Sequence, residues 1–330
     1  MTHSIPPTPP PPPPQLTELA LPTEKSLPSR LGMAHVHTVE AVTDRLRSLA
    51  RQLGGQAELF GAAAQHYTRW LSVPATDVVT ARLRAALAEL HTETGWAYYD
   101  SGVDGAGYFT RALDLADHAG DGHGIVNAAW HAGATLLHSG HPNDALKAFQ
   151  LGQFQLRGYD SSKSTPATIR GDDPRVPAIA ARLEVSSAAA YARMGHREKA
   201  GRAFSAAREQ QQPGDVYERA DKDLNAARIQ ADLGRLEVAE RFAAAAVRTF
   251  GSGHRRDRAM ANLVLAELHV HAGEPCGVEL AHHAVREVSQ LHSVPTRQRL
   301  EPLAALLDAR SGADARHLAR QARQVAATRA

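Results

Sequence analysis

The sequence predicts an all-α protein, built as a right-handed α-solenoid of tetratricopeptide-like helical hairpins. The first observation behind this prediction is a motif in which a small residue lies seven positions before a Gly and another, usually Ala, lies five positions after it. The four copies are centred on Gly140, Gly195, Gly234 and Gly273. Gly commonly ends a helix, and small side chains let two antiparallel helices touch, so each copy is typical of a helical hairpin.

Spacing and composition support the same fold class. The small residue after the Gly recurs at 39-residue intervals, from Ala200 to Ala239 and from Ala239 to Val278. This is longer than the 34 residues of the tetratricopeptide repeat, so we expect slightly longer helices or turns. Apolar residues make up 43% of the chain but aromatic residues only 5%. A chain that relies on Ala and Leu suits close helix packing and fits poorly with a β-sheet.

The bulk properties exclude several classes of protein. The 330 residues carry a formal net charge of +2, too balanced to indicate a nucleic-acid partner. The single cysteine, Cys276, cannot form an internal disulfide and fits a reducing compartment. No apolar run approaches the ~18 residues that a membrane span needs, and no signal peptide is recognisable. We therefore expect a cytoplasmic protein with no membrane contact and no direct nucleic-acid binding.

Residues 1–30 predict a disordered, proline-rich tail. The run Pro9–Pro14 cannot form a helix, because each proline lacks a backbone donor and has a fixed φ. An extended, solvated polyproline segment is expected. A ligand for a proline-binding groove is the alternative to a simple flexible tail.

From residue 31 to residue 330 we expect one helical domain. Apolar residues recur at helical spacing in each of its first segments, and the breaks fall at Gly54, Gly55 and Pro74. Thr76 or Asp77 would cap the third helix. The first helices are predicted over residues 36–53, 56–71, 78–99 and 103–119.

The repeats follow and are interrupted once. The interval from Ala145 to Ala200 is 55 residues instead of 39, and the surplus lies in residues 158–177, which are rich in Ser, Pro and Gly. We expect a flexible insertion there, with a functional lid as the alternative. Two last helices are predicted over 297–309 and 313–327, and the second is polar enough to cap the stack.

Several segments are longer than repeat patterning alone would produce. They are LPSRLGMAH (27–35), LAELHTETGW (87–96), YFTRALDLA (108–116), DALKAFQLGQ (144–153), RQRLEPL (297–303) and ADARHLA (313–319). On these segments the chain resembles the tetratricopeptide-type C-terminal region of actinobacterial, Streptomyces-type transcriptional regulators that carry an N-terminal helix-turn-helix domain. That domain is missing here, and the insertion at 158–177 departs from the pattern. The resemblance implies a sensor or interaction module, in the regulation of specialised metabolism.

The first helix of each repeat unit is expected to line a concave groove. Phasing each unit on its small residue gives a polar and aromatic wall that can bind a peptide, a small metabolite or a protein partner. Half of the wall could instead be surface or packing residues. The candidate groove residues are Tyr98, Asn127, Trp130, His131, His138, Arg182, Asn225, Arg228, Glu267 and His271, with His91, Thr94, Ser186, Arg193, Asp221 and Asp232 as further members.

Histidine is abundant, and its densest group surrounds Cys276. Imidazole and thiolate are good zinc ligands, which makes His269, His271, His282 and His283 metal candidates. Their spacing matches no known signature, so solvated or packed histidines, and no metal or other cofactor, are the expectation.

The sequence favours binding over catalysis. It lacks the phosphate loop GxxxxGK[ST] and the motifs HExxH and GxSxG, and no catalytic residue is nominated. We expect a ligand- or partner-binding regulatory protein, with homodimerisation possible. The alternatives are a scaffold that pairs with a DNA-binding homologue and a biosynthetic enzyme that uses the groove histidines.

Overall fold

The computed structural model describes residues 27–156, 176–209 and 216–328. Apart from residues 27–30, the predicted tail lies outside the described residues. The predicted insertion at 158–177 also lies outside them, except for Val176 and Pro177, which begin a helix. Within the described ranges every regular element is a helix, as the sequence predicts.

The helices follow one another along the chain, and most of the described connections between them are short. They are α1 (Met33–Leu53), α2 (Ala57–Thr68), η2 (Arg69–Ser72), α3 (Asp77–Asp100), α4 (Ala106–Ala119), α5 (Gly122–His138), α6 (Pro142–Leu156), α7 (Val176–Arg193), α8 (Arg197–Glu209), α9 (Val216–Asp232), α10 (Leu236–Thr249), η3 (Ser252–His254), α11 (Arg255–Ala272), α12 (Gly277–Ser289), α13 (Val294–Gln298), α14 (Leu300–Asp308) and α15 (Ala313–Ala327).

These helices pack as consecutive hairpins. Helix α3 packs on α4, α5 on α6, α7 on α8, α9 on α10 and α11 on α12. The four motif glycines lie between the helices of a hairpin, and each has a positive φ: +85° at Gly140, +76° at Gly195, +76° at Gly234 and +80° at Gly273. Because residues with a side chain rarely adopt this conformation, the motif glycines end the first helix of each hairpin, as predicted.

The small residues of the motif lie where the two helices of a hairpin touch. A Cβ atom added to Gly133 on α5 would come within 2.4 Å of the Phe149 ring on α6. In the later copies, Ala188, Ala227 and Ala266 are fully buried. The absence of larger side chains here lets the paired helices approach closely.

One predicted helix is divided. The sequence predicts a single helix over 297–309, whereas the structure has α13 and α14, which are separated at Arg299. Pro302 has no N–H to donate to the carbonyl of Gln298, and its ring would clash with that carbonyl in a continuous helix. A proline in this position therefore ends α13 after one short turn.

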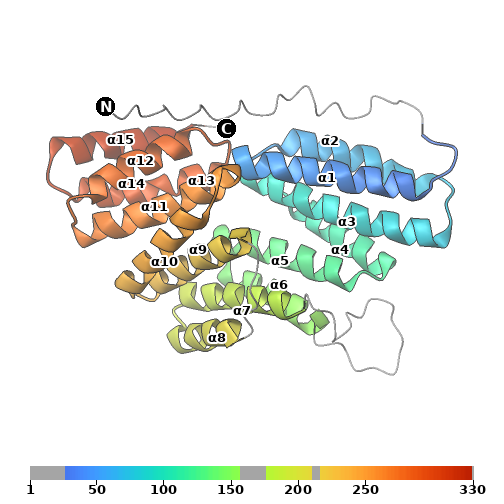
Figure 1. Ribbon diagram of the computed structural model, residues 1–330, viewed down its shortest axis with the longest axis horizontal. Coiled ribbons are helices and arrows are strands. Elements are labelled where there is room, and N and C mark those ends of the chain that lie inside the picture. Colours follow the sequence, from blue (N-terminus) through green and yellow to red (C-terminus); the bar gives the residue numbers. More distant parts are fainter. Residues whose placement is uncertain (1–26, 157–175, 210–215, 329–330) are drawn as a thin grey trace, which may run out of the picture.

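The first helices, α1 and α3, meet helices from the last third of the chain, so the row of hairpins closes on itself (Figure 1). Helix α1 contacts α11 and η3, and α3 contacts α13. At this seam the His292 N–H donates to the Leu53 carbonyl at 2.7 Å, and the Gly55 N–H donates to Asp100 Oδ2 at 2.7 Å. Ser293 Oγ donates to the other oxygen of the buried Asp100 carboxylate.

The helices differ in their apolar character from membrane-spanning segments. Among the described residues, no helix is both long and apolar enough to cross a bilayer.

Candidate functional site

The first helices of successive hairpins enclose a cavity of about 1040 Å³. Side chains from α1, α3, α5, α7, α9, α11 and α13 form most of its wall, whereas the second helices contribute only Phe149 and Ala207. A second hollow of about 940 Å³ shares Trp130 and Arg182 with this cavity. The volume of the first cavity is that of a site for a small molecule or a short peptide.

The structure brings together the candidate residues on α5, α7 and α9. They come from three consecutive first helices, and all of them line the cavity: Asn127, Trp130, His131, His138, Arg182, Asn225 and Arg228. The small residues of the motif fix which face of each helix packs on its partner, so the opposite face could be predicted.

Tyr98 on α3 does not line the cavity. Its ring packs against that of Tyr108 at a centroid distance of 4.7 Å, on the side of α3 that faces α4. The next residue, Tyr99, lines the cavity instead. His91 and Thr94 lie on the same packed side of α3 as Tyr98, and both are buried. The rotation predicted for α3 was therefore wrong by about one residue.

Neither candidate residue on α11 lines the cavity. His271 is exposed in the last turn of the helix, whereas the cavity is lined by Arg256, Asp257 and Met260 near its start. Glu267 lies behind the wall, where its Oε2 accepts a hydrogen bond from Arg299 Nη2 at 2.9 Å. The repeat pattern gave the correct helix but placed the site at the wrong end of it.

On the α1–α3 side of the cavity, charges are paired. Arg47 Nε donates to Glu93 Oε1 at 2.8 Å, and the same guanidinium donates to Glu89 and to Asp44. Burial opposes ionisation of Glu93, but the Arg47 guanidinium holds the pKa of this carboxyl below its usual value. We call Arg47, Glu89 and Glu93 the paired wall.

Aromatic rings form the floor between the two sides. Trp96 and Tyr99 come from α3, and Trp130 comes from α5. The Arg182 guanidinium lies 3.3 Å from the Trp130 ring centroid, and Trp130 Nε1 donates to Ser186 Oγ at 2.8 Å. These contacts hold the Trp130 indole in place, so that the rings offer a preformed flat apolar surface.

Two histidines beside these rings are held neutral. Burial lowers the pKa of His131 to about 4, although Glu93 opposes the shift. Burial also lowers the pKa of His138, and here the surrounding arginines, Arg228 first, lower it further. At neutral pH both imidazoles are therefore uncharged, and each keeps a lone pair.

On the α7–α13 side, four arginines converge: Arg193, Arg228, Arg256 and Arg299, which we call the arginine wall. Three of them have carboxylate partners. Arg193 lies 3.8 Å from Asp232, and Arg256 lies 3.1 Å from Asp257 and 3.6 Å from Asp100. Arg299 binds Glu267 at 2.9 Å.

Arg228 is the exception. Its Nη1 donates to His138 Nε2 at 3.3 Å, and among the described residues no carboxylate lies within the 4.0 Å of a salt bridge. Burial and the neighbouring Arg299 and Arg193 lower the pKa of Arg228 to about 10, so its charge is held at a cost. Asp221 also lines the cavity, and burial raises the pKa of its carboxyl, which weakens it as a counter-charge. The arrangement fits an anionic group that enters the cavity beside Arg228.

Several lining residues were missed by the sequence prediction. Trp96 and Tyr99 could have been found from their spacing of three on α3, which places them on one face. Arg256 and Arg299 gave no such signal, because they reach the cavity only when the last hairpins close onto the first. Arg193 was predicted, and it joins them at the arginine wall.

The predicted histidine group around Cys276 does not come together as a whole. His282 points to Asp314 at 3.2 Å, His283 lies 3.7 Å from Glu287, and His271 is exposed. Only His269 approaches Cys276, and Glu274 joins the two.

No protein-family model matches the chain, and a search of curated proteins found no relative. The family is therefore not identified. The structure supports an all-helical protein whose paired helices pack in sequence.

Proposed function

We propose that this chain is a ligand-binding regulatory or sensor protein, a right-handed tetratricopeptide-like solenoid whose inner cavity binds an organic carboxylate. Two sources share this chemistry: a carboxylate metabolite with a flat apolar part, and the C-terminus of a short peptide. The resemblance to regulator C-terminal regions supports a sensing role, in specialised metabolism.

One observation carries the proposal: Arg228 faces an otherwise preformed cavity, and none of the described residues gives it a carboxylate partner. A ligand carboxylate placed there would relieve the repulsion among the arginines and receive charge-assisted hydrogen bonds. The rings of Trp96, Tyr99 and Trp130 would cover the apolar part of the same ligand. The ligand would favour the state that binds it more tightly, in which the first and last helices lie in closer contact. This shift between states would then change the outer surface of the protein.

The test compares acids with their uncharged amides. Indole-3-acetate and indole-3-acetamide, and the peptide Ala-Ala-Phe with a free or an amidated C-terminus, are titrated calorimetrically against the wild type. We expect each acid to bind more tightly than its amide by about 10- to 100-fold, the value of a hydrogen bond to a charged group. If the larger difference in affinity between acid and amide is found for the indole compounds, the ligand is a carboxylate metabolite; if it is found for the peptides, the ligand is a peptide C-terminus.

Two variants complete the test. Arg228→Gln should remove the preference for the acid, whereas Arg202→Gln, on the exposed surface of α8, should retain it. Equal affinities of the wild type for acid and amide, or equal losses in the two variants, would contradict the proposal.

A further inference from the structure

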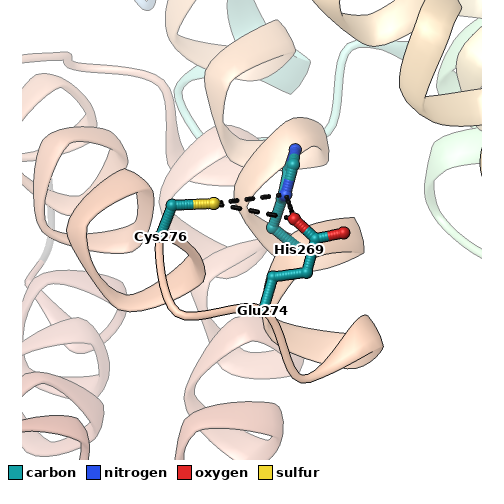
Figure 2. Close-up of side chains that lie close together, drawn as sticks. All are labelled: His269, Glu274 and Cys276. Carbon is teal, nitrogen blue, oxygen red and sulfur yellow. Dashed lines mark hydrogen bonds and ion pairs between the residues drawn. The ribbon is translucent and has the colours of Figure 1, made fainter.

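A second site lies at the opposite end of α11 from the cavity, in the turn between α11 and α12 (Figure 2). His269 comes from the last turn of α11, Glu274 from the turn and Cys276 from the N-cap of α12. One ligand atom from each residue lies within 4.8 Å of the other two. We propose that these three side chains bind a Zn²⁺ ion, with water in the fourth position.

The distances between the ligand atoms fit zinc. Cys276 Sγ lies 3.5 Å from His269 Nδ1 and 3.6 Å from Glu274 Oε2. Tetrahedral zinc with bonds of about 2.0–2.3 Å separates its ligand atoms by about 3.3–3.6 Å. The third distance, from Nδ1 to Oε2, is 2.6 Å, the length of a hydrogen bond between the imidazole and the carboxylate. An ion that replaces the proton of this hydrogen bond would need the carboxylate to move outward by under about 1 Å.

The backbone holds the ligands in this arrangement. Gly273, with a φ of +80°, turns the chain back on α11, so that the Glu274 N–H donates to the His269 carbonyl at 3.1 Å. A Cβ atom on Gly277 would lie 2.8 Å from the Val270 nitrogen, so only glycine lets the start of α12 lie this close to the end of α11. Two glycines thus bring the thiol and the imidazole together before any ion binds.

A partner on a third helix orients the imidazole. His269 Nε2 lies 3.5 Å from Glu240 Oε1 on α10. A carboxylate on one ring nitrogen favours the tautomer in which the other nitrogen carries a lone pair, and this is the usual second contact of a zinc-bound histidine. Once an ion has replaced the proton between Nδ1 and Glu274, the carboxylate of Glu240 would accept from the Nε2–H of the bound imidazole.

Charge and access also suit a divalent cation. A thiolate and a carboxylate together supply two negative charges, and the imidazole adds a neutral nitrogen donor. Cys276 is exposed, so an ion reaches the site without opening a core. The bound ion would connect α11 to α12 directly and to α10 through Glu240.

Cobalt substitution tests this site specifically. Cys276 is the only cysteine of the chain, so a thiolate-to-Co²⁺ charge-transfer band can arise only there. We expect the untagged full-length protein to show this band, together with the intense visible bands of tetrahedral Co²⁺, at one equivalent of cobalt. Zn²⁺ should displace the cobalt and abolish both signals.

Matched variants separate the site from other histidines. Cys276→Ser and His269→Gln should lose the charge-transfer band, whereas His271→Gln and His282→Gln, outside the cluster, should keep it. Glu240→Gln should retain the band but weaken the affinity for cobalt by about 10- to 100-fold. Circular dichroism checks that each variant is folded. The absence of a thiolate band in the wild type, or its equal loss in the His271 and His282 variants, would overturn the proposal.

Discussion

The two sides of the cavity treat buried arginines in opposite ways. On the paired wall, one guanidinium, that of Arg47, serves Glu89, Glu93 and Asp44. On the arginine wall, four guanidinium groups converge, and within the part of the chain that the structure describes Arg228 has no carboxylate of its own. The comparison separates two settings of the same residue type: Arg47 is neutralised within the fold, whereas the charge of Arg228 is the one that we propose a ligand carboxylate neutralises.

The largest effect is expected from breaking the paired wall. Arg47→Met would leave the buried Glu93 carboxylate without its counter-charge, and the free energy of unfolding should fall by about 3 kcal/mol. Chemical denaturation measures this change. The double variant Arg47→Met/Glu93→Leu should recover most of the loss, because no unpaired charge remains. If the double variant is no more stable than the single one, the pairing is not what stabilises this wall.

A change of opposite sign is expected at the arginine wall. Arg228→Met replaces an unpaired charge with an apolar side chain of similar length, so the free energy of unfolding should stay equal or rise by about 1 kcal/mol. The acid ligands should no longer stabilise this variant in a thermal-unfolding assay. A loss of stability comparable to that of Arg47→Met would show that Arg228 also completes the fold.

A third comparison concerns pH, and it contrasts the two walls through their histidines. The pKa of His131 is about 4, and that of His138 is well below its ordinary value of 6.5. As the pH falls below 6.5, the unfolded chain takes up protons that the folded chain does not bind, so folded-state stability decreases. Each histidine should cost of order 1–2 kcal/mol between pH 7 and pH 5.

Substitution of the cavity histidines tests whether they cause this dependence of the free energy of unfolding on pH. His131→Gln and His138→Gln should each flatten the decline in the free energy of unfolding with falling pH, whereas the exposed His271→Gln should not. The charges that act on the pKa of His138 are all arginines and lower it, whereas Glu93 partly offsets the lowering of the pKa of His131. A slope that is unchanged in both cavity variants would rule out this origin.

The sequence could predict the helical hairpins and the cavity faces of α5, α7 and α9, because a small residue marks the packed side of each first helix. The contact of Gly133 with the Phe149 ring shows why: a larger side chain on the packed side of α5 would clash with α6. The face of α3 was predicted incorrectly at Tyr98, because this longer helix of 24 residues precedes the clear copies of the motif.

Other parts of the site depend on tertiary closure. Arg256 and Arg299 belong to the last third of the chain, yet they reach a cavity whose opposite wall is α1 and α3. No local pattern specifies which ends of distant helices will meet. Of the four histidines considered as metal candidates, only His269 lies in the cluster at Cys276, and Glu274 was not among the candidates, because the return of the chain at Gly273 brings in a residue that helical spacing does not select.

The seam between the first and last hairpins has a further consequence. The buried apolar side chains of α1 to α5 and those of α11 to α15 form separate clusters, and the contacts that join the two sides include the hydrogen bonds from Ser293 to Asp100 and from His292 to Leu53. Water can replace such bonds at little net free-energy cost, whereas parting a hydrophobic core is expensive. We therefore expect this seam to open more readily than either of these two clusters, which would give a solute a way inward.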